Sequence, residues 1–152
     1  MRRADPASFA RALILMGVLA ACGQGVRAEG AGALQPTPAP EGAHLYFISP
    51  VDGARLTNPV TIRFGLAGMG VAPAGVQNPK AGHHHLIIDA PTPPAGMPIP
   101  SDAHHRHFGG GQTEVTLDLP LGTHTLQLVL GDYEHVPFDP PIVSKRITVT
   151  VE

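Results

Sequence analysis

The chain has 152 residues and a formal net charge of −2 at neutral pH. This balance argues against nucleic acid as a partner and against polybasic binding to membranes, since both require a basic surface. With a single cysteine the chain cannot form an internal disulfide, so its fold must rest on a packed apolar core. Nine histidines in a chain without tryptophan are its most unusual feature.

The N-terminal residues are typical of a bacterial export signal. Basic residues precede an apolar run over residues 12–21, which is shorter than the roughly 20 apolar residues needed to cross a bilayer. The run ends in Leu-Ala-Ala followed by Cys22, which resembles the lipobox whose cysteine becomes the lipidated first residue. We therefore predict a lipoprotein-type signal peptide over residues 1–21 and lipidation of Cys22.

Lipidation would leave the protein facing the periplasm, attached to the membrane through its lipid anchor only. Gly23 follows the cysteine in place of the aspartate associated with inner-membrane retention, which favours the outer membrane. Cleavage after Ala28 is the alternative, because Val-Arg-Ala fits the rule for ordinary signal sites, and it would give a soluble periplasmic or secreted protein.

Residues 22–42 are rich in Gly, Ala and Pro, a composition that predicts an extended tether without a core of its own. The remaining residues, 43–152, are expected to form one domain. Apolar residues alternate with polar ones in short runs separated by turn signals, and we expect strands at residues 44–48, 60–64, 85–89, 115–119, 124–130 and 147–151. The pattern predicts an all-β fold, an immunoglobulin-like antiparallel β-sandwich of about seven strands.

Two connections, over residues 65–82 and 90–103, are too long to be simple turns. A run of histidines lies where each of these loops meets a strand. Such positions often carry binding residues, because the rigid strands hold the loop ends in place.

The histidine runs predict a metal site. In a strand, residues i and i+2 point to the same side, so His83 pairs with His85, and His105 pairs with His107. Four imidazoles are sufficient ligands for a copper or zinc ion. We expect the four side chains to converge at one end of the sandwich, while His84 points to the core and is held by a backbone carbonyl.

Other residues could add ligands or support the primary ones. His124 and His135 flank the strand at residues 124–130, Asp89 ends another strand, and Met97 in the second long loop offers a thioether that favours Cu(I). The two histidines also have a simpler interpretation. His124 shares the apolar face as a hydrogen-bonded core residue, and His135 fixes the turn in which it lies.

Three segments together resemble the bacterial DUF4399 family. They are Gly-His-His-His-Leu-Ile-Ile-Asp at residues 82–89, His-Phe-Gly-Gly-Gly-Gln-Thr-Glu at 107–114, and His-Thr-Leu-Gln-Leu-Val-Leu-Gly-Asp at 124–132. The similarity covers roughly residues 44–152. It implies an exported single-domain protein, and the family name records an unknown function.

We expect a non-enzymatic binding module for a transition metal, copper before zinc. Motifs of metalloproteases, serine hydrolases, phosphate-binding loops and dithiol oxidoreductases do not occur in the sequence. An interaction module without metal, docking an envelope protein or a glycan, is the alternative. A metal-dependent hydrolase is the third hypothesis.

Overall fold

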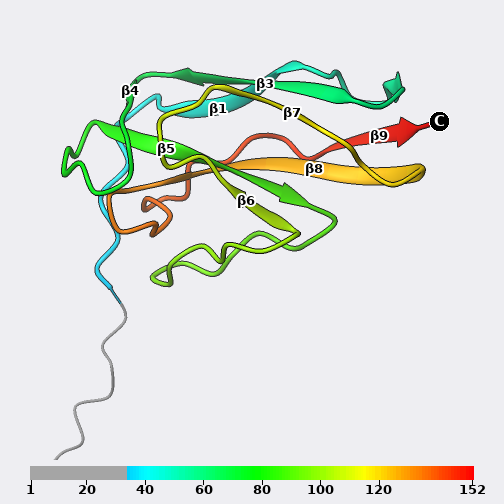
Figure 1. The fold of residues 1–152 in the computed structure, drawn as a ribbon. Helices are drawn as coiled ribbons and strands as arrows, with labels where there is room; N and C mark the ends of the chain where they lie inside the picture. The colour runs from blue at the N-terminus through cyan, green and yellow to red at the C-terminus, as the bar shows by residue number, and fades with distance from the viewer. Residues whose placement is uncertain (1–33) are drawn as a thin grey trace, which may run out of the picture. The chain divides into compact units, whose positions relative to one another are not determined.

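The computed structural model describes residues 34–152; the predicted signal peptide, Cys22 and most of the predicted tether lie outside this range. The described residues form strands and connections without a helix, so none of them makes a helix that is long and apolar enough to cross a membrane. The strands form two sheets that face each other (Figure 1). The predicted all-β sandwich is confirmed.

The smaller sheet has three antiparallel strands in the order β1-β3-β7. Its central strand alternates as predicted, with Val60, Ile62 and Phe64 buried and the two residues between them exposed. The strands are β1 (His44–Ser49), β3 (Val60–Ala67) and β7 (Glu114–Leu117).

The larger sheet has the order β2-β9-β8-β5-β4, and β6 also pairs with β5. The β2–β9 and β4–β5 pairs are parallel and the others are antiparallel. Residues 34–152 therefore contain nine strands instead of about seven, because β2, β4 and β6 are only two or three residues long and too short to show a period. The strands are β2 (Arg55–Leu56), β4 (Gly70–Val71), β5 (Ala81–Ile88), β6 (His105–His107), β8 (Gly122–Gly131) and β9 (Ile147–Val151).

The main core lies between the two sheets, and a smaller apolar cluster covers the outer face of the larger sheet. In the small cluster, Ile87 of β5 and Val129 of β8 pack against Ile99 from the loop at residues 90–103. This loop therefore folds back over the sheet. Buried members of the main core include Ile62, Phe64, Leu86, Phe108, Leu126, Leu128, Phe138 and Val149.

Strand β5 is buried at all eight positions because it is covered on both faces. A strand in this setting usually reads as a continuous apolar run. In β5 the run is interrupted by the three histidines His83, His84 and His85, each with an exposed fraction of 0%. The strand begins at Ala81, four residues before its predicted start, so these histidines lie within the strand and not at the end of a loop.

The described end of the predicted tether is attached to the domain. The backbones of Thr37 and Ala39 hydrogen bond with that of Asp139, and the Thr37 hydroxyl donates to Asp132 at 2.7 Å. Residues 37–39 thus extend the ordered domain beyond its predicted start at residue 43.

Candidate metal centre

Four histidines from three separate parts of the chain meet on the outer face of the larger sheet. His83 and His85 project from β5 on the side opposite His84, as strand alternation requires. His107 of β6 lies directly opposite His85 in the antiparallel pairing. His135 comes from the turn that follows β8. We call these four residues the histidine cluster.

The spacing of the four rings is close to that of four imidazoles around a tetrahedral metal ion. All six distances between its ring centroids lie between 4.7 and 6.0 Å, and four points with nearly equal separations form a tetrahedron. With metal–nitrogen distances of about 2.0–2.1 Å, four imidazoles around one ion place their ring centres about 5 Å apart.

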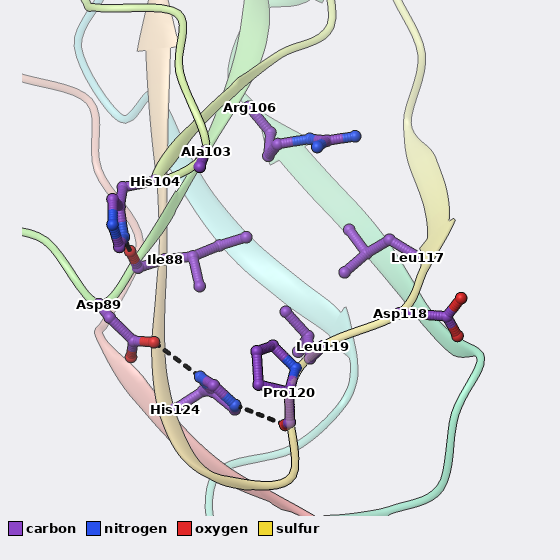
Figure 2. A pocket seen from close by; sticks show the side chains of 10 residues that line it. All are labelled: Ile88, Asp89, Ala103, His104, Arg106, Leu117, Asp118, Leu119, Pro120 and His124. Carbon is purple, nitrogen blue, oxygen red and sulfur yellow. Dashed lines mark hydrogen bonds and ion pairs between the residues drawn. The ribbon is translucent and has the colours of Figure 1, made fainter.

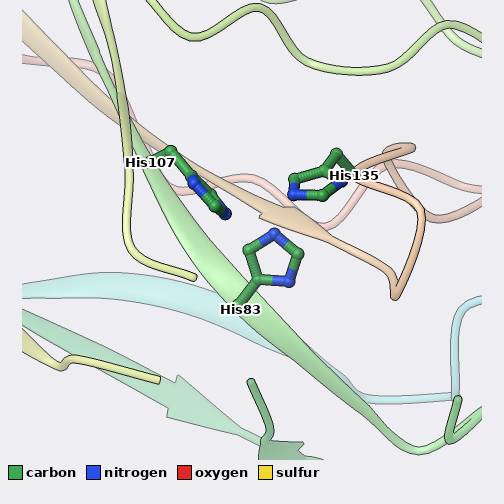
Figure 3. Close-up of side chains that lie close together, drawn as sticks. All are labelled: His83, His107 and His135. Carbon is green, nitrogen blue, oxygen red and sulfur yellow. The ribbon is translucent and has the colours of Figure 1, made fainter. Parts of the chain in front are cut away.

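Three members come closest through their nitrogen atoms. One ring nitrogen each of His83, His107 and His135 lie within 4.8 Å of one another (Figure 3). Tetrahedral nitrogen ligands of zinc lie about 3.4 Å apart, so binding would draw these rings inward by about 1 Å. Rotation of side chains supplies movements of this size. The nitrogen atoms of His85 are not part of this close group, but its ring centroid lies 4.9 and 5.0 Å from those of His83 and His107.

The buried histidines lack hydrogen-bond partners. Both ring nitrogens of His83 and His85 are buried, and neither ring makes a hydrogen bond to any residue in the described range 34–152. Buried polar atoms are nearly always paired, because leaving one without a partner costs about 1–3 kcal/mol. The two buried imidazoles therefore lower the stability of the fold relative to apolar side chains at the same positions. A bound ion would give their lone pairs a partner.

Protonation states in the cluster suit a metal ion. Burial, with smaller contributions from the neighbouring histidines, lowers the pKa of His83 to about 4 and that of His85 to about 2. Burial also lowers the pKa of His107. His83, His85 and His107 are therefore mainly neutral at pH 7, and neutral imidazole is the form that binds a metal.

Asp132 supports the cluster in two ways. Its carboxylate is buried and accepts hydrogen bonds from the backbone N–H groups of Glu134 and Val136, which fixes the turn that carries His135. His135 has a φ of 68°, a left-handed conformation that few residues other than glycine adopt. The negative charge of Asp132 also acts on His83, where it favours a positive charge.

Two glycines leave room for the rings. A Cβ atom on Gly131 of β8 would lie 2.9 Å from Nε2 of His85, and one on Gly109 would lie 2.6 Å from Nε2 of His107. Real Cβ atoms do not approach other atoms this closely. Glycine at these positions therefore lets the two rings take their places in the cluster.

The predicted convergence of His83, His85, His105 and His107 holds for three of these residues, with His135 in the place expected for His105. His105 hydrogen bonds through Nδ1 to Asp102 at 2.9 Å and is not among the grouped rings. The cluster lies on the outer face of a sheet and not at one end of the sandwich.

His124 and Asp89 lie apart from the cluster, in a cavity of about 220 Å³ (Figure 2). His124 Nδ1 donates to Asp89 at 2.6 Å, and Nε2 lies 2.8 Å from the carbonyl oxygen of Pro120. The bond to Asp89 raises the pKa of His124. Burial acts to raise the pKa of Asp89, but the hydrogen bonds from His124 and Thr125 lower it overall. This pair ties β5 to the turn before β8, in agreement with the structural interpretation of His124.

Two further expectations have mixed outcomes. Met97 is 55% exposed in its loop, which leaves its predicted role as a ligand untested. His84 faces the main core as predicted, with its ring 5.3 Å from that of Phe64. The expected hydrogen bond to a backbone carbonyl is not formed within the described residues. The backbone of Gln112 acts to raise the pKa of His84, but it does not have hydrogen-bond geometry.

Fold and site together define a β-sandwich domain with a cluster of four histidines, two of them fully buried, on its larger sheet. Residues 62–152 match the family model for a domain of unknown function, DUF4399, and since the match spans more than half of the chain, the protein belongs to this family. The resemblance found in the sequence is thereby confirmed. All four cluster histidines lie within the matched segment. Neither the curated proteins nor the solved structures include a match to the chain.

Proposed function

We propose that this domain binds one transition-metal ion, copper or zinc, through His83, His85, His107 and His135. The observation that supports this most strongly is the pair of fully buried histidines, His83 and His85, which have no hydrogen-bond partner among residues 34–152 and pack against two further histidines. The lowered pKa values of His83, His85 and His107 favour neutral imidazole at pH 7, the form that binds an ion without first losing a proton.

The donor set favours a borderline or soft ion. Imidazole nitrogen is a common ligand of zinc and copper, whereas magnesium and calcium prefer oxygen ligands. A tetrahedral arrangement suits Zn²⁺ and Cu(I) better than Cu²⁺, which prefers a square-planar or tetragonal geometry. Among copper ions, this argument favours Cu(I).

We also propose that the domain is exported and anchored by a lipid on Cys22, so that the metal site faces the periplasm. The support is the signal-like sequence ending at Cys22, the only cysteine of the chain. Labelling cells with a lipid precursor tests this: the wild-type protein takes up the label and Cys22→Ala does not. Label retained by the variant would rule out the anchor.

Equilibrium dialysis tests metal binding. The untagged chain from Gly23 onward is dialysed against Zn²⁺, Cu²⁺ and, under reducing conditions, Cu(I), and bound metal is counted per chain. We expect one ion per chain with a Kd below micromolar. Replacing His83 and His85 together by alanine should abolish stoichiometric binding, whereas His44→Ala, which removes an exposed histidine bonded to the Gly42 carbonyl, should leave it unchanged.

The same experiment separates the alternatives. A well-folded chain that binds none of these ions would contradict the proposal and favour an interaction module. A metal-dependent hydrolase has one supporting observation, the closest group of three nitrogens from His83, His107 and His135, since catalytic zinc sites keep three ligands and one open position. In that case His85→Ala would retain the ion, and a fourth ligand position would be held by water.

A further inference from the structure

The two inner members of the cluster are closed off from solvent. His83 and His85 have exposed fractions of 0%, whereas His107 and His135 reach the surface. His107 and His135 are therefore the members of the cluster that an ion arriving from solvent meets first. The surface beside these residues decides how the site is loaded.

A polar pocket of about 300 Å³ opens next to His107 on the edge strand β6. His105 and His107 alternate with Arg106 along the strand, so both imidazoles lie on one face. Arg106 directs its side chain toward the cavity on the opposite face, where Figure 2 shows it. The pocket is lined by Ser101, Asp102, His105, Arg106 and His107.

His105 is held in the form of a metal ligand. Oδ1 of Asp102 accepts hydrogen bonds from the backbone N–H groups of His104 and His105 and lies 2.9 Å from Nδ1 of the His105 ring. A carboxylate can only accept, so Nδ1 of the His105 ring donates to it, and the lone pair of the neutral ring is then on Nε2. A histidine bonded to a carboxylate through one nitrogen is the usual arrangement of a ligand that binds metal through the other. Yet His105 is outside the four-histidine cluster.

We infer that His105, oriented by Asp102, is a capture ligand that binds an incoming ion in this pocket and passes it to His107 and the buried pair. The inference rests on the proposed function of the cluster. Asp102 is exposed and negatively charged, so it also attracts cations to the mouth of the pocket. His107, which belongs to both the pocket and the cluster, connects the two.

A ligand that holds the ion on its way to the cluster lowers the energy barrier between the free ion and the bound ion. It does not change the free energy of either the metal-free or the metal-bound protein. Removing it should slow loading and unloading by the same factor and leave Kd unchanged. The test mixes the metal-free chain with Zn²⁺, or with Cu(I) if only copper binds at equilibrium, stops the reaction with a chelator at timed intervals, and counts the retained metal. Unloading is followed by transfer to the same chelator.

We expect His105→Ala to slow loading and unloading severalfold, because it removes the ring that would hold the ion on its route. Asp102→Asn should have a smaller effect in the same direction, because the amide oxygen keeps the backbone hydrogen bonds and only the charge is lost. His104→Ala is the matched control, since its ring bonds to the Ile88 carbonyl beside the other cavity, and its rates should not change.

Unchanged rates in His105→Ala, in a chain that binds metal, would overturn the capture role alone. A weaker Kd with faster unloading would also overturn it, since His105 would then be a ligand of the bound state. A wild-type chain that binds neither ion would overturn the proposed function itself, before any variant is compared.

Discussion

The metal-free domain should lose stability steeply between pH 6.5 and pH 5. Burial lowers the pKa of His83 and His84 to about 4 and that of His85 to about 2, whereas an unfolded histidine titrates near 6.5. The sign follows from proton binding: below pH 6.5 the unfolded chain takes up protons that the folded chain does not, so acid favours unfolding.

The magnitude follows from the same values. For every pH unit below 6.5, each buried histidine lowers the free energy of unfolding by about 1.4 kcal/mol. At pH 5 the three histidines together lower it by about 6 kcal/mol. Domains of this size are stable by about 5–15 kcal/mol, so the loss is a large part of the total. Carboxylates with lowered pKa, such as Asp89, lose their contribution below about pH 4, outside this window.

His124 acts in the opposite direction. Its pKa is raised, so its contribution is present below pH 6.5 and is lost as the pH rises through the raised value. The one raised pKa of His124 stands against three lowered ones, so the dependence of the free energy of unfolding on pH keeps the sign set by the three buried rings.

Urea unfolding followed by circular dichroism, in the presence of a chelator at several pH values, measures this slope. His84→Met removes one buried titrating group without touching the cluster and should reduce the slope by about one proton. A free energy of unfolding that stays constant from pH 7 to pH 5 would refute the argument. An unchanged slope in His84→Met would refute it for that residue.

Three further changes have specific expected outcomes. Gly109→Ala should push the His107 ring out of the cluster and weaken metal binding in the dialysis experiment, with little effect on the free energy of unfolding. Gly70→Ala is the control: its new Cβ would meet ordinary contacts at 3.7 and 3.8 Å, so the affinity for metal should not change. Asp89→Asn should cost about 1–2 kcal/mol of stability at pH 6 and less at pH 8, because the hydrogen bond to charged His124 is lost; equal costs at both pH values in urea unfolding would contradict this. Ile62→Ala should cost about 2–5 kcal/mol by leaving a cavity in the main core, while the number of metal ions bound per chain stays the same.

Alternation along the chain predicted the parts of the site that lie on strands. The spacing of His83 and His85 places both rings on one side of β5 and His84 on the other, and the structure agrees. The same rule placed His105 beside His107 on one face, which is correct, but it could not tell which of the two lies opposite His85. That depends on the register between β5 and β6, and the 90–103 loop that sets it has no period.

His135 could be suggested but not placed by sequence reasoning. It lies in a turn and takes a left-handed conformation, so neither strand nor helix periodicity gives its direction. The signals that mark its position are local: Asp132 three residues earlier, whose side chain accepts the backbone N–H groups of the turn, and Gly131, which leaves room for His85. Two-residue strands such as β2 and β4 escape prediction for a related reason, because a period needs more residues than they have.

Metal binding and folding should be coupled in this domain. The energy that the buried rings of His83 and His85 cost the metal-free fold is recovered, in part, when an ion occupies the lone pairs that no described residue contacts. An ion that binds the folded state also stabilises it by about 2.7 kcal/mol at one hundred times its Kd. His84 gains nothing from this, because its ring faces the opposite side of β5. A saturating ion should therefore raise the free energy of unfolding but leave its acid dependence in place, because the unfolded chain still takes up protons below pH 6.5 that the folded chain does not.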